Sequence, residues 1–315
     1  MKSQKFPTAV LAVVVTHKRS ELLEQCLLAL TNQTEKCDIL IVNNSPDDKA
    51  TLKVINSFVT RYDSIFFHNM KSNTGGAGGF RKGMQEAFKE EYEYSWLLDD
   101  DALPDSNCLE RLKIAAKQQS LDSKGRRIAF YCSLVLTNSG KLCETNLPLL
   151  SKSPMSHLSD GKLQLEVQQC SFVSVLFPRF TVAQAGFPVK QMFIGGDDLE
   201  YTRRVSRFIG FGFICLDSVV RHSESAILPT YRQPIKNSNL SRKKREFENY
   251  FSTLLAHGEY LTFIRNLCAF FVKIFMAPEE RRYFGIFLKA LAALPARYAD
   301  IKCELKKVDS GSGNS

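Results

Sequence analysis

Hydrophobic runs alternate with helical spacings over about the first third of the chain. Residues 9–15 (AVLAVVV) form a continuous aliphatic run, which predicts a strand buried on both faces. Residues 21–31 place leucines three and four positions apart, which predicts a helix, and residues 38–42 (DILIV) predict a second buried strand. The alternation continues with helices predicted at 49–62 and 80–89, strands at 64–68 and 94–98, and a glycine loop at 73–79. This order predicts an open, mostly parallel α/β sheet.

The pattern changes in the second half of the chain. Short apolar runs separated by polar and proline-containing segments predict strands of a mixed sheet at 128–136, 163–168 and 171–177, with a loop over the sheet at 145–160. A polar, basic connector follows at 232–247, and helical patterns are expected at 246–266, 267–277 and 278–304. We therefore expect a first domain over 1–234, a C-terminal helical region over 235–305 and a disordered tail over 306–315.

Composition narrows the class of protein. The 315 residues are 44% hydrophobic and 24% charged, which excludes a disordered, collagen-like or disulfide-scaffold protein. The net charge of +9 favours anionic partners such as nucleotide diphosphates, nucleic acid or acidic lipid headgroups. The 9 cysteines include no CxxC pair, which makes zinc knuckles unlikely and indicates buried thiols in a reducing cytosol. Lysines and a proline interrupt the apolar stretches 267–277 and 284–296, so no transmembrane segment is predicted.

Three adjacent carboxylates, Asp99, Asp100 and Asp101, directly follow a predicted strand. Ligands of open α/β sheets bind beyond the carboxyl ends of the strands, where these acids would lie. Neighbouring like charges raise one another's pKa, and a divalent cation can offset that cost. A solvated acidic turn that caps the next helix is the alternative. The position after a buried strand favours a metal site.

The segment 73–80 (NTGGAGGF) places four glycines between a predicted strand and a predicted helix. Glycine allows the backbone to approach another backbone or a ligand closely. The segment is not a Walker A loop, because no Gly-Lys-Ser/Thr follows, and it is not the dinucleotide motif that follows a first strand. A ligand-binding loop and a purely structural tight turn both remain open.

Two more acids, Asp197 and Asp198, stand at the start of a helix predicted to run to about residue 209. Either carboxylate could cap that helix. Because only one is needed as a cap, the other is a candidate general base for a nucleophilic hydroxyl. His222 follows a strand-like run at 211–216. Alone it is typical of a surface or capping residue, but with the three aspartates it is a candidate nitrogen ligand for an Mn²⁺-like ion.

Taken in order, six segments resemble those of family 2 glycosyltransferases of the GT-A fold, most of all the galactofuranosyltransferase and rhamnosyltransferase-like branch. The segments are VVVTHKR, DILIVNNS, NTGGAGGF, WLLDDD, IGGDDLEY and VVRHS, between about residues 9 and 223. The resemblance implies an α/β fold of GT-A type, with a mostly parallel, mixed central sheet flanked by helices. It assigns residues 1–234 to the catalytic domain, followed by the C-terminal helical region.

The resemblance also implies roles for individual residues. Asp99 and Asp101 match the outer acids of the family's D-x-D signature, which bind Mn²⁺ or Mg²⁺, and His222 matches the distal histidine ligand. Asp198 matches the acid that acts as base in single-displacement inversion, with Asp197 as the other catalytic candidate. Residues implied to bind the donor are Thr16, His17, Arg19, Asn43, Asn44, Asn73, Gly75, Gly76 and Asp100.

Two departures from the family pattern are visible. Gly195 and Gly196 stand where the family often has a tryptophan before the acid pair. Many members also carry Tyr-Tyr-x-x-Arg-Asn in a later helix. Here Asn249-Tyr250-Phe251 is separated from Arg265-Asn266 by a longer interval.

The function implied by the resemblance is inverting, metal-dependent transfer of a sugar from a nucleotide sugar to a glycan in cell-surface polysaccharide biosynthesis. UDP-galactofuranose is the first choice of donor and dTDP-rhamnose the second. One rival is a nucleotidyltransferase, but its glycine and lysine signature would stand where the chain has Thr16-His17-Lys18-Arg19. The other rival is a non-catalytic membrane- or anion-binding protein, which would leave the acids without a purpose. No nucleic acid partner is expected, because no RNP-like or zinc-finger pattern is present.

Basic residues and bulky apolar residues alternate in blocks in the C-terminal region. They are Arg242–Arg245, Phe270, Phe271, Ile274–Met276, Arg281, Arg282, Phe284 and Ile286–Leu288. Such blocks are typical of helices on an anionic membrane surface. They predict a cytoplasmic enzyme bound peripherally to the inner face of the cytoplasmic membrane, with a lipid-linked glycan as acceptor. The alternative is that these residues pack against the catalytic domain or against a second copy of the chain.

Overall fold

The computed structural model describes residues 8–118, 121, 126–151, 157–159, 162–222, 240–276, 281 and 283–311. Within them the strands are β1 (Val10–Thr16), β2 (Asp38–Asn43), β3 (Ile65–Asn69), β4 (Tyr94–Asp99), β5 (Ala102–Pro104), β6 (Ile128–Thr137), β7 (Leu149–Leu150), β8 (His157–Ser159), β9 (Lys162–Gln169), β10 (Val175–Pro178) and β11 (Phe211–His222). The α-helices are α1 (Ser20–Thr31), α2 (Lys49–Arg61), α3 (Gly75–Lys89), α4 (Cys108–Gln118), α5 (Arg179–Ala185), α6 (Asp197–Phe208), α7 (Leu240–Ala256), α8 (Tyr260–Met276) and α9 (Phe284–Gly311). Short 3₁₀ helices lie at η1 (Glu144–Asn146) and η2 (Lys190–Met192).

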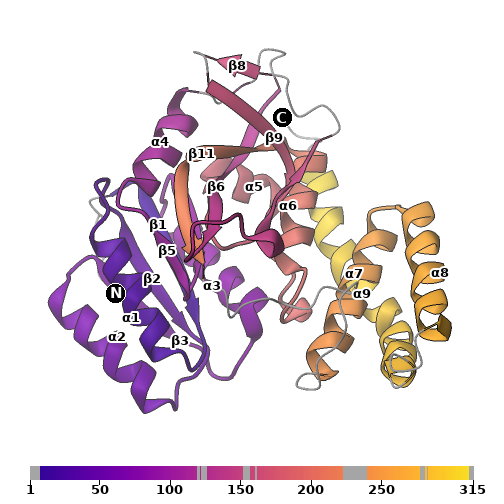
Figure 1. Ribbon diagram of the computed structural model, residues 1–315. Coiled ribbons are helices and arrows are strands. Elements are labelled where there is room, and N and C mark those ends of the chain that lie inside the picture. The colour runs from indigo at the N-terminus through magenta and orange to yellow at the C-terminus, as the bar shows by residue number, and fades with distance from the viewer. Residues whose placement is uncertain are drawn as a thin grey trace.

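The described strands form a mixed sheet in the order β3-β2-β1-β4-β10-β6-β11-β9-β7, with β5 paired to β11 and β8 to β9 (Figure 1). Strands β1 to β4 are parallel to one another, as the continuous aliphatic runs predict. Strand β10 runs antiparallel between β4 and β6, and β6 is parallel to β11. The carboxyl ends of β1, β2, β4 and β11 therefore lie along the same edge of the sheet. The sheet class predicted from the sequence is confirmed.

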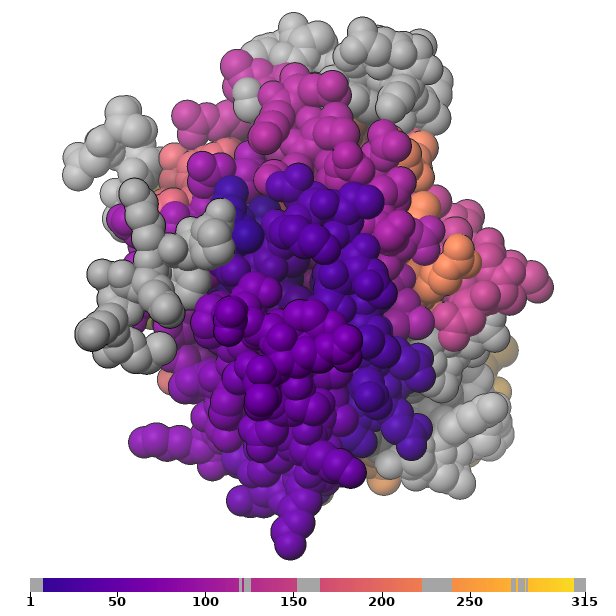
Figure 2. All heavy atoms as spheres, turned by 90° about the vertical axis from the view of Figure 1, so that its left-hand side faces the viewer, coloured from indigo at the N-terminus to yellow at the C-terminus, as the bar shows by residue number. Residues whose placement is uncertain are grey.

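Helices cover both faces of the sheet and form two hydrophobic cores. On one face, α1, α2 and α4 bury residues such as Leu27, Phe58 and Leu112 against the strands. Figure 2 shows this side of the molecule, where the indigo and purple N-terminal part of the chain fills the centre of the view. On the other face, α3, α5 and α6 bury residues such as Met84 and Tyr201. This three-layer packing holds the carboxyl edge of the sheet rigid, which a binding site at that edge requires.

The three C-terminal helices pack on one another around a phenylalanine cluster. Phe247 and Phe251 of α7, Phe270 of α8 and Phe287 of α9 form this cluster. Helix α9 also reaches back to the sheet domain, where Arg81 of α3 and Glu304 of α9 form an ion pair of 3.0 Å. In Figure 1 these helices stand beside the sheet, and α8 is the outermost of them.

The C-terminal boundaries differ from those predicted. The break expected at residue 266 falls at Gly258, whose φ of +73° ends α7. The Gly258 N–H donates to the Leu255 carbonyl and the Glu259 N–H to the Leu254 carbonyl, which is the Schellman arrangement. Part of the expected connector, from Leu240 onward, is the first half of α7. Residues 223–239 and 278–280 lie outside the described residues.

Three other boundaries differ from those predicted. The tail expected from residue 306 is helical up to Gly311, because Val308 is buried at 4% exposure. The loop expected at 145–160 contains the short strands β7 and β8, which pair with β9. The strand expected at 171–177 begins only at Val175.

Candidate active site

A cleft of about 500 Å³ opens at the carboxyl ends of β1 and β4. Of the residues selected from the sequence, those that line it are Thr16, His17, Arg19, Asn44, Asn73, Gly75, Gly76, Asp99, Asp100, Asp101, Asp197, Asp198 and His222. These residues come from separate segments of the chain, and the parallel strands bring them to one edge. Asn43 is absent from the described lining of the cleft.

Asp99, Asp101 and His222 form a cluster in which one ligand atom from each residue lies within 4.8 Å of the others. The topology explains why the distant histidine is there, because His222 is the last residue of β11 and pairs with Ala102 of β5. Its Nε2 lies 3.0 Å from Oδ1 of Asp101. Two carboxylates and an imidazole are a donor set that suits Mn²⁺. The solvated turn that the sequence left open does not form, since Asp100 and Asp101 are each 4% exposed.

The middle acid, Asp100, has a different environment. Its Oδ2 accepts a hydrogen bond of 2.7 Å from the Thr16 hydroxyl, and its Oδ1 accepts one of 3.1 Å from Nη1 of Arg19. The same Nη1 donates to Oδ2 of Asp101 at 3.0 Å. Arg19 is 46% exposed at its side chain, so this cation also borders the open cleft. Thr16 and Arg19 therefore fix the direction of the acidic turn.

The environment of the cluster shifts the pKa of each group. Burial raises the pKa of Asp99 to about 7, and the charges of Asp101 and Asp198 add to that effect. Burial also acts on Asp101, but the hydrogen bond and charge of His222 outweigh it and lower the pKa of Asp101. Burial opposes protonation of His222, whereas Asp101 and Asp99 raise its pKa to about 9. The cluster therefore concentrates negative charge that a cation can balance.

Two asparagines predicted to bind a donor make hydrogen bonds within the protein. Asn43 is fully buried, donates to Oδ1 of Asn69 at 2.9 Å, and accepts from the Ser45 N–H at 2.9 Å. Asn44 accepts from the Thr74 N–H at 3.0 Å and donates to the Gly75 carbonyl at 3.0 Å. Asn44 thereby holds the glycine segment against the end of β2, while His17 and Asn73 present their side chains at the rim.

The glycine segment is the first part of a helix and not the loop predicted at 73–79, because α3 begins at Gly75. Gly79 and Gly83 lie one turn apart and face β1 so closely that a Cβ would come within 2.4 Å of Val15 and 2.1 Å of Val13. The spacing of four residues between glycines thus reflects the packing of α3 on the sheet. Gly75 and Gly76 still line the cleft.

Asp197 and Asp198 occupy the first turn of α6, and neither is its cap. The N-cap is Gly196, which has no side chain that could accept a capping hydrogen bond. Burial and the charge of Asp198 raise the pKa of Asp197 well above its usual value. Burial raises the pKa of Asp198 only to about 6, because the Leu199 N–H donates to its carboxylate at 2.8 Å. Asp198 is thus the acid of the pair that ionises more easily.

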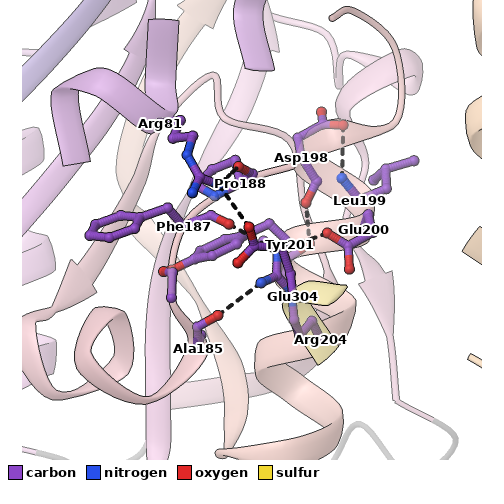
Figure 3. A network of polar contacts seen from close by, with 12 residues as sticks. Arg81, Ala185, Phe187, Pro188, Asp198, Leu199, Glu200, Tyr201, Arg204 and Glu304 are labelled. Carbon is purple, nitrogen blue, oxygen red and sulfur yellow. Dashed lines mark hydrogen bonds and ion pairs between the residues drawn. The ribbon is translucent and has the colours of Figure 1, made fainter. Parts of the chain in front are cut away.

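Helix α6 is anchored behind the acids by a buried ion pair (Figure 3). Nη2 of Arg204 lies 2.9 Å from Oε2 of Glu200, and both side chains are fully buried. The same guanidinium donates to the carbonyls of Ala185 at 2.8 Å and Phe187 at 3.2 Å. Because the guanidinium is satisfied on several sides, α6 is held in a fixed orientation. The acids therefore sit on a rigid element.

Helix α7 contributes a wall of the cleft that the sequence did not single out. Arg242, Glu246 and Tyr250 line it, four residues apart and on one helix face. Asn266 donates to the Tyr250 hydroxyl, so two parts of the interrupted Tyr-Tyr-x-x-Arg-Asn pattern meet in space. The spacing of four residues was the sequence signal that these side chains share one helix face. Their residue types, however, fit a solvent-exposed face equally well. Phe172 and Asn146 also line the cleft and belonged to no motif singled out in the sequence.

A mixed sheet with acids at its carboxyl edge, a distal histidine and a second acid pair defines a GT-A glycosyltransferase fold. The chain belongs to the family 2 glycosyltransferases, because it is 32% identical over 224 residues to galactofuranosyltransferase GlfT1 from Mycolicibacterium smegmatis, covering 68% of this chain and 70% of that protein. The GlfT1 protein from Mycobacterium tuberculosis is 31% identical over 219 residues, with coverage of 68% and 70%. The family model "Glycosyl transferase family 2" matches residues 11–160.

Solved structures share the fold at low sequence identity. GalNAc-T7 with UDP, GalNAc and Mn²⁺ superposes with a TM-score of 0.57 at 12% identity, covering 78% of this chain and 48% of that chain. The mannosyltransferase PcManGT from Pyrobaculum calidifontis, in complex with GDP-Man and Mn²⁺, gives a TM-score of 0.52 at 13% identity, with coverage of 98% and 76%. Among the described residues, no helix is both long and apolar enough to cross a membrane.

Proposed function

We propose that this glycosyltransferase moves a sugar, with inversion, from UDP-galactofuranose to a glycan in cell-surface polysaccharide biosynthesis. The observation that carries the proposal is the meeting of the Asp99, Asp101 and His222 cluster with Asp197 and Asp198 in one cleft. Similarity to two galactofuranosyltransferases supports the choice of sugar. We propose that residues 1–234 form the catalytic domain and that the helices after it complete the cleft.

The residues of the cluster fit a divalent metal. Asp99, Asp101 and His222 would hold Mn²⁺ or Mg²⁺, since carboxylates and imidazole are ligands of such ions and the three ligand atoms converge within 4.8 Å. When bound, such an ion supplies positive charge that stabilises the departing nucleoside diphosphate. Arg19 and Asn73, at the rim of the same cleft, would contact the polar groups of the donor.

The acid pair supplies the base. Asp198 lies in the cleft with a pKa of about 6, so it is ionised at neutral pH and can accept a proton from the acceptor hydroxyl. As that proton leaves, the hydroxyl oxygen attacks the anomeric carbon from the face opposite the diphosphate. The bond to the diphosphate breaks in the same step, which inverts the configuration. The wall formed by Arg242, Glu246 and Tyr250 would border the acceptor.

Thermal denaturation with a panel of nucleotide sugars tests the donor. A donor at a hundredfold excess over its Kd adds about 2.7 kcal/mol to the free energy of unfolding. With Mn²⁺ present, UDP-galactofuranose is expected to raise Tm more than dTDP-rhamnose, UDP-galactopyranose or GDP-mannose does. Release of UDP that depends on acceptor then confirms transfer. A larger shift with dTDP-rhamnose would instead identify a rhamnosyltransferase.

We further propose that α8 rests on an anionic membrane surface, where a lipid-linked acceptor would be found. Its outward face carries a stripe of exposed apolar side chains, namely Leu261, Ile264, Val272 and Met276, with Leu261 86% and Met276 80% exposed. Between Tyr260 and Met276 the sequence has two basic residues and no acidic residue. Apolar side chains flanked by cations match an anionic lipid surface better than a neutral one. The location would then be the cytoplasmic face of the membrane.

Co-sedimentation with vesicles tests the membrane proposal. The wild-type chain is expected to bind anionic vesicles, to bind neutral ones much less, and to dissociate as salt is added. The double variant Leu261→Glu and Ile264→Glu should lose at least tenfold in binding. Leu28→Glu is the matched control, because Leu28 is an exposed apolar residue of α1, 42% exposed, outside the stripe. A wild-type chain that forms soluble dimers and ignores both vesicle types would overturn the proposal.

A further inference from the structure

The segment that leads into the acid pair has an unfavourable backbone. Phe193 has φ 62° and ψ −64°, a region that side chains other than glycine rarely adopt. The Ile194 N–H donates to the Met192 carbonyl at 2.7 Å, so Phe193 is the centre of a tight γ-turn of the rare kind. Such a strained turn is kept only where contacts with the surrounding structure stabilise it.

Helix α7 holds this turn through one side chain. Nδ2 of Asn249 is 2.9 Å from the carbonyl oxygen of Met192, 3.2 Å from that of Ile194 and 2.8 Å from that of Gly195. Asn249 is fully buried. One amide group thus faces three carbonyls of the turn and offsets the repulsion between their aligned dipoles.

Helix α3 supports the turn from the other side. The Ala77 N–H donates to the Phe193 carbonyl at 3.1 Å. Gly75 makes room for that carbonyl, since a Cβ at position 75 would lie 1.9 Å from its oxygen. The Phe193 ring lies under Arg245 of α7, with 4.3 Å between the guanidinium carbon and the ring centroid.

The acid pair depends on this turn for its direction. Asp197 follows the turn after only Ile194, Gly195 and Gly196, and α6 begins there without a side-chain cap. Gly195 and Gly196 have φ of +84° and +91°, and a Cβ at Gly195 would lie 2.8 Å from Cγ of Glu246. The backbone therefore excludes the tryptophan that the family often has at this point. It also brings α7 directly against the residues that precede the acids.

We propose that Asn249 is the positioning residue of the acid pair: it holds the strained turn at Phe193 so that Asp197 and Asp198 face the cleft. The inference rests on the proposed function, because that function gives the acids their role. Oδ1 of Asn249 is buried without a hydrogen-bond partner, so the polar contacts of this side chain are those of Nδ2 with the carbonyls of the turn. An unpaired buried acceptor costs stability, so a residue present only for packing would be apolar.

Two substitutions at this position test the proposal. Asn249→Asp keeps the size of the side chain and replaces its donors with a carboxylate that the three carbonyls repel. Asn249→Ala removes the donors without adding charge, and it tests the proposal if the aspartate variant does not fold. In either folded variant, kcat for transfer should fall at least tenfold, while the Kd for UDP in the presence of Mn²⁺ stays within twofold. The acid limb of the kcat profile should also move, because the environment of Asp198 changes.

Ser252→Ala is the matched control. Ser252 is also fully buried on α7, but it lies against the Leu294 carbonyl of α9. Its variant should retain full kcat and an unchanged pH profile. Two outcomes would contradict the positioning role. The first is wild-type kcat in the folded Asn249 variants. The second is a loss of UDP affinity and of folded protein in proportion to the loss of kcat.

A readout without substrate separates this inference from the proposed function. Hydrogen exchange of the peptide covering residues 189–198 should be at least tenfold faster in Asn249→Ala than in wild type, and unchanged in Ser252→Ala. Faster exchange together with a wild-type chain that transfers no sugar would overturn the proposed function and leave the role of Asn249 in the turn standing. If exchange in Asn249→Ala equals that of the wild type, and the wild type does transfer sugar, the role of Asn249 is overturned and the proposed function stands.

Discussion

Treatment with EDTA is expected to abolish sugar transfer, and added Mn²⁺ or Mg²⁺ is expected to restore it. The physical reason is the charge in the cluster, since Asp99, Asp101 and His222 converge within 4.8 Å, and Asp101 and His222 are buried. Without a cation, the diphosphate of a donor would approach carboxylates that repel it. Asp101→Ala and His222→Ala should therefore lose metal-dependent donor binding, measured by titration calorimetry with UDP and Mn²⁺.

Asp217→Ala is a suitable control for the metal experiment. Asp217 is a carboxylate of the same strand as His222, but its side chain is 50% exposed and lies near Arg111 outside the cleft. It should bind UDP and Mn²⁺ as the wild type does. Full transfer in the presence of chelator, with donor affinity intact in Asp101→Ala and His222→Ala, would contradict the assignment of the cluster.

Replacing Asp198 by asparagine should lower kcat by at least about 10² and leave donor binding nearly unchanged. General-base catalysis typically contributes 10² to 10⁴, and asparagine keeps the shape of the side chain but cannot accept the proton. In the wild type, kcat should fall as the pH drops below about 6, because protonation of Asp198 removes the base. The measurement is the pH profile of kcat at saturating donor and acceptor, compared between wild type and variant.

Asp197→Asn distinguishes the two acids. Asp197 is the more buried of the pair, and burial together with the charge of Asp198 raises its pKa well above the usual value, which makes it the poorer candidate for the base. Its variant is expected to retain more activity than Asp198→Asn. A normally folded, active Asp198→Asn beside an inactive Asp197→Asn would assign the base to Asp197.

The sheet could be predicted from the sequence because a parallel strand that is buried on both faces consists of a continuous run of aliphatic residues. It was wrong about residues 73–79, since glycines at a spacing of four can mean a helix pressed on a strand as well as a loop. Gly79 and Gly83 have that spacing and contact Val15 and Val13. Only the partner strand, which is distant in sequence, distinguishes the two cases.

The cleft shows a similar limit. His222 could be named as a candidate nitrogen ligand, and the family resemblance supported that role. Its position beside the aspartates could not be derived from the sequence, because the pairing of β11 with β5 joins segments that are far apart in sequence. Asn43 and Asn44 were grouped together as donor ligands. Consecutive side chains of an extended segment point in opposite directions, and that of Asn43 enters a buried network with Asn69 and Ser45. Helix α7 was missed as a wall because Arg242, Glu246 and Tyr250 are ordinary residues of a polar helix face until the cleft is formed.

Thr16 and Tyr250 line the same cleft although most of the chain lies between them. During synthesis on the ribosome, the acids at the end of β4 and then His222 are made before α7 is. A nascent chain that stops short of α7 would thus display the acidic edge of the sheet but lack Asn249, the residue proposed to hold the turn at Phe193. Transfer activity should accordingly appear only when nearly the whole polypeptide has been made, and fragments from early termination would waste no activated sugar.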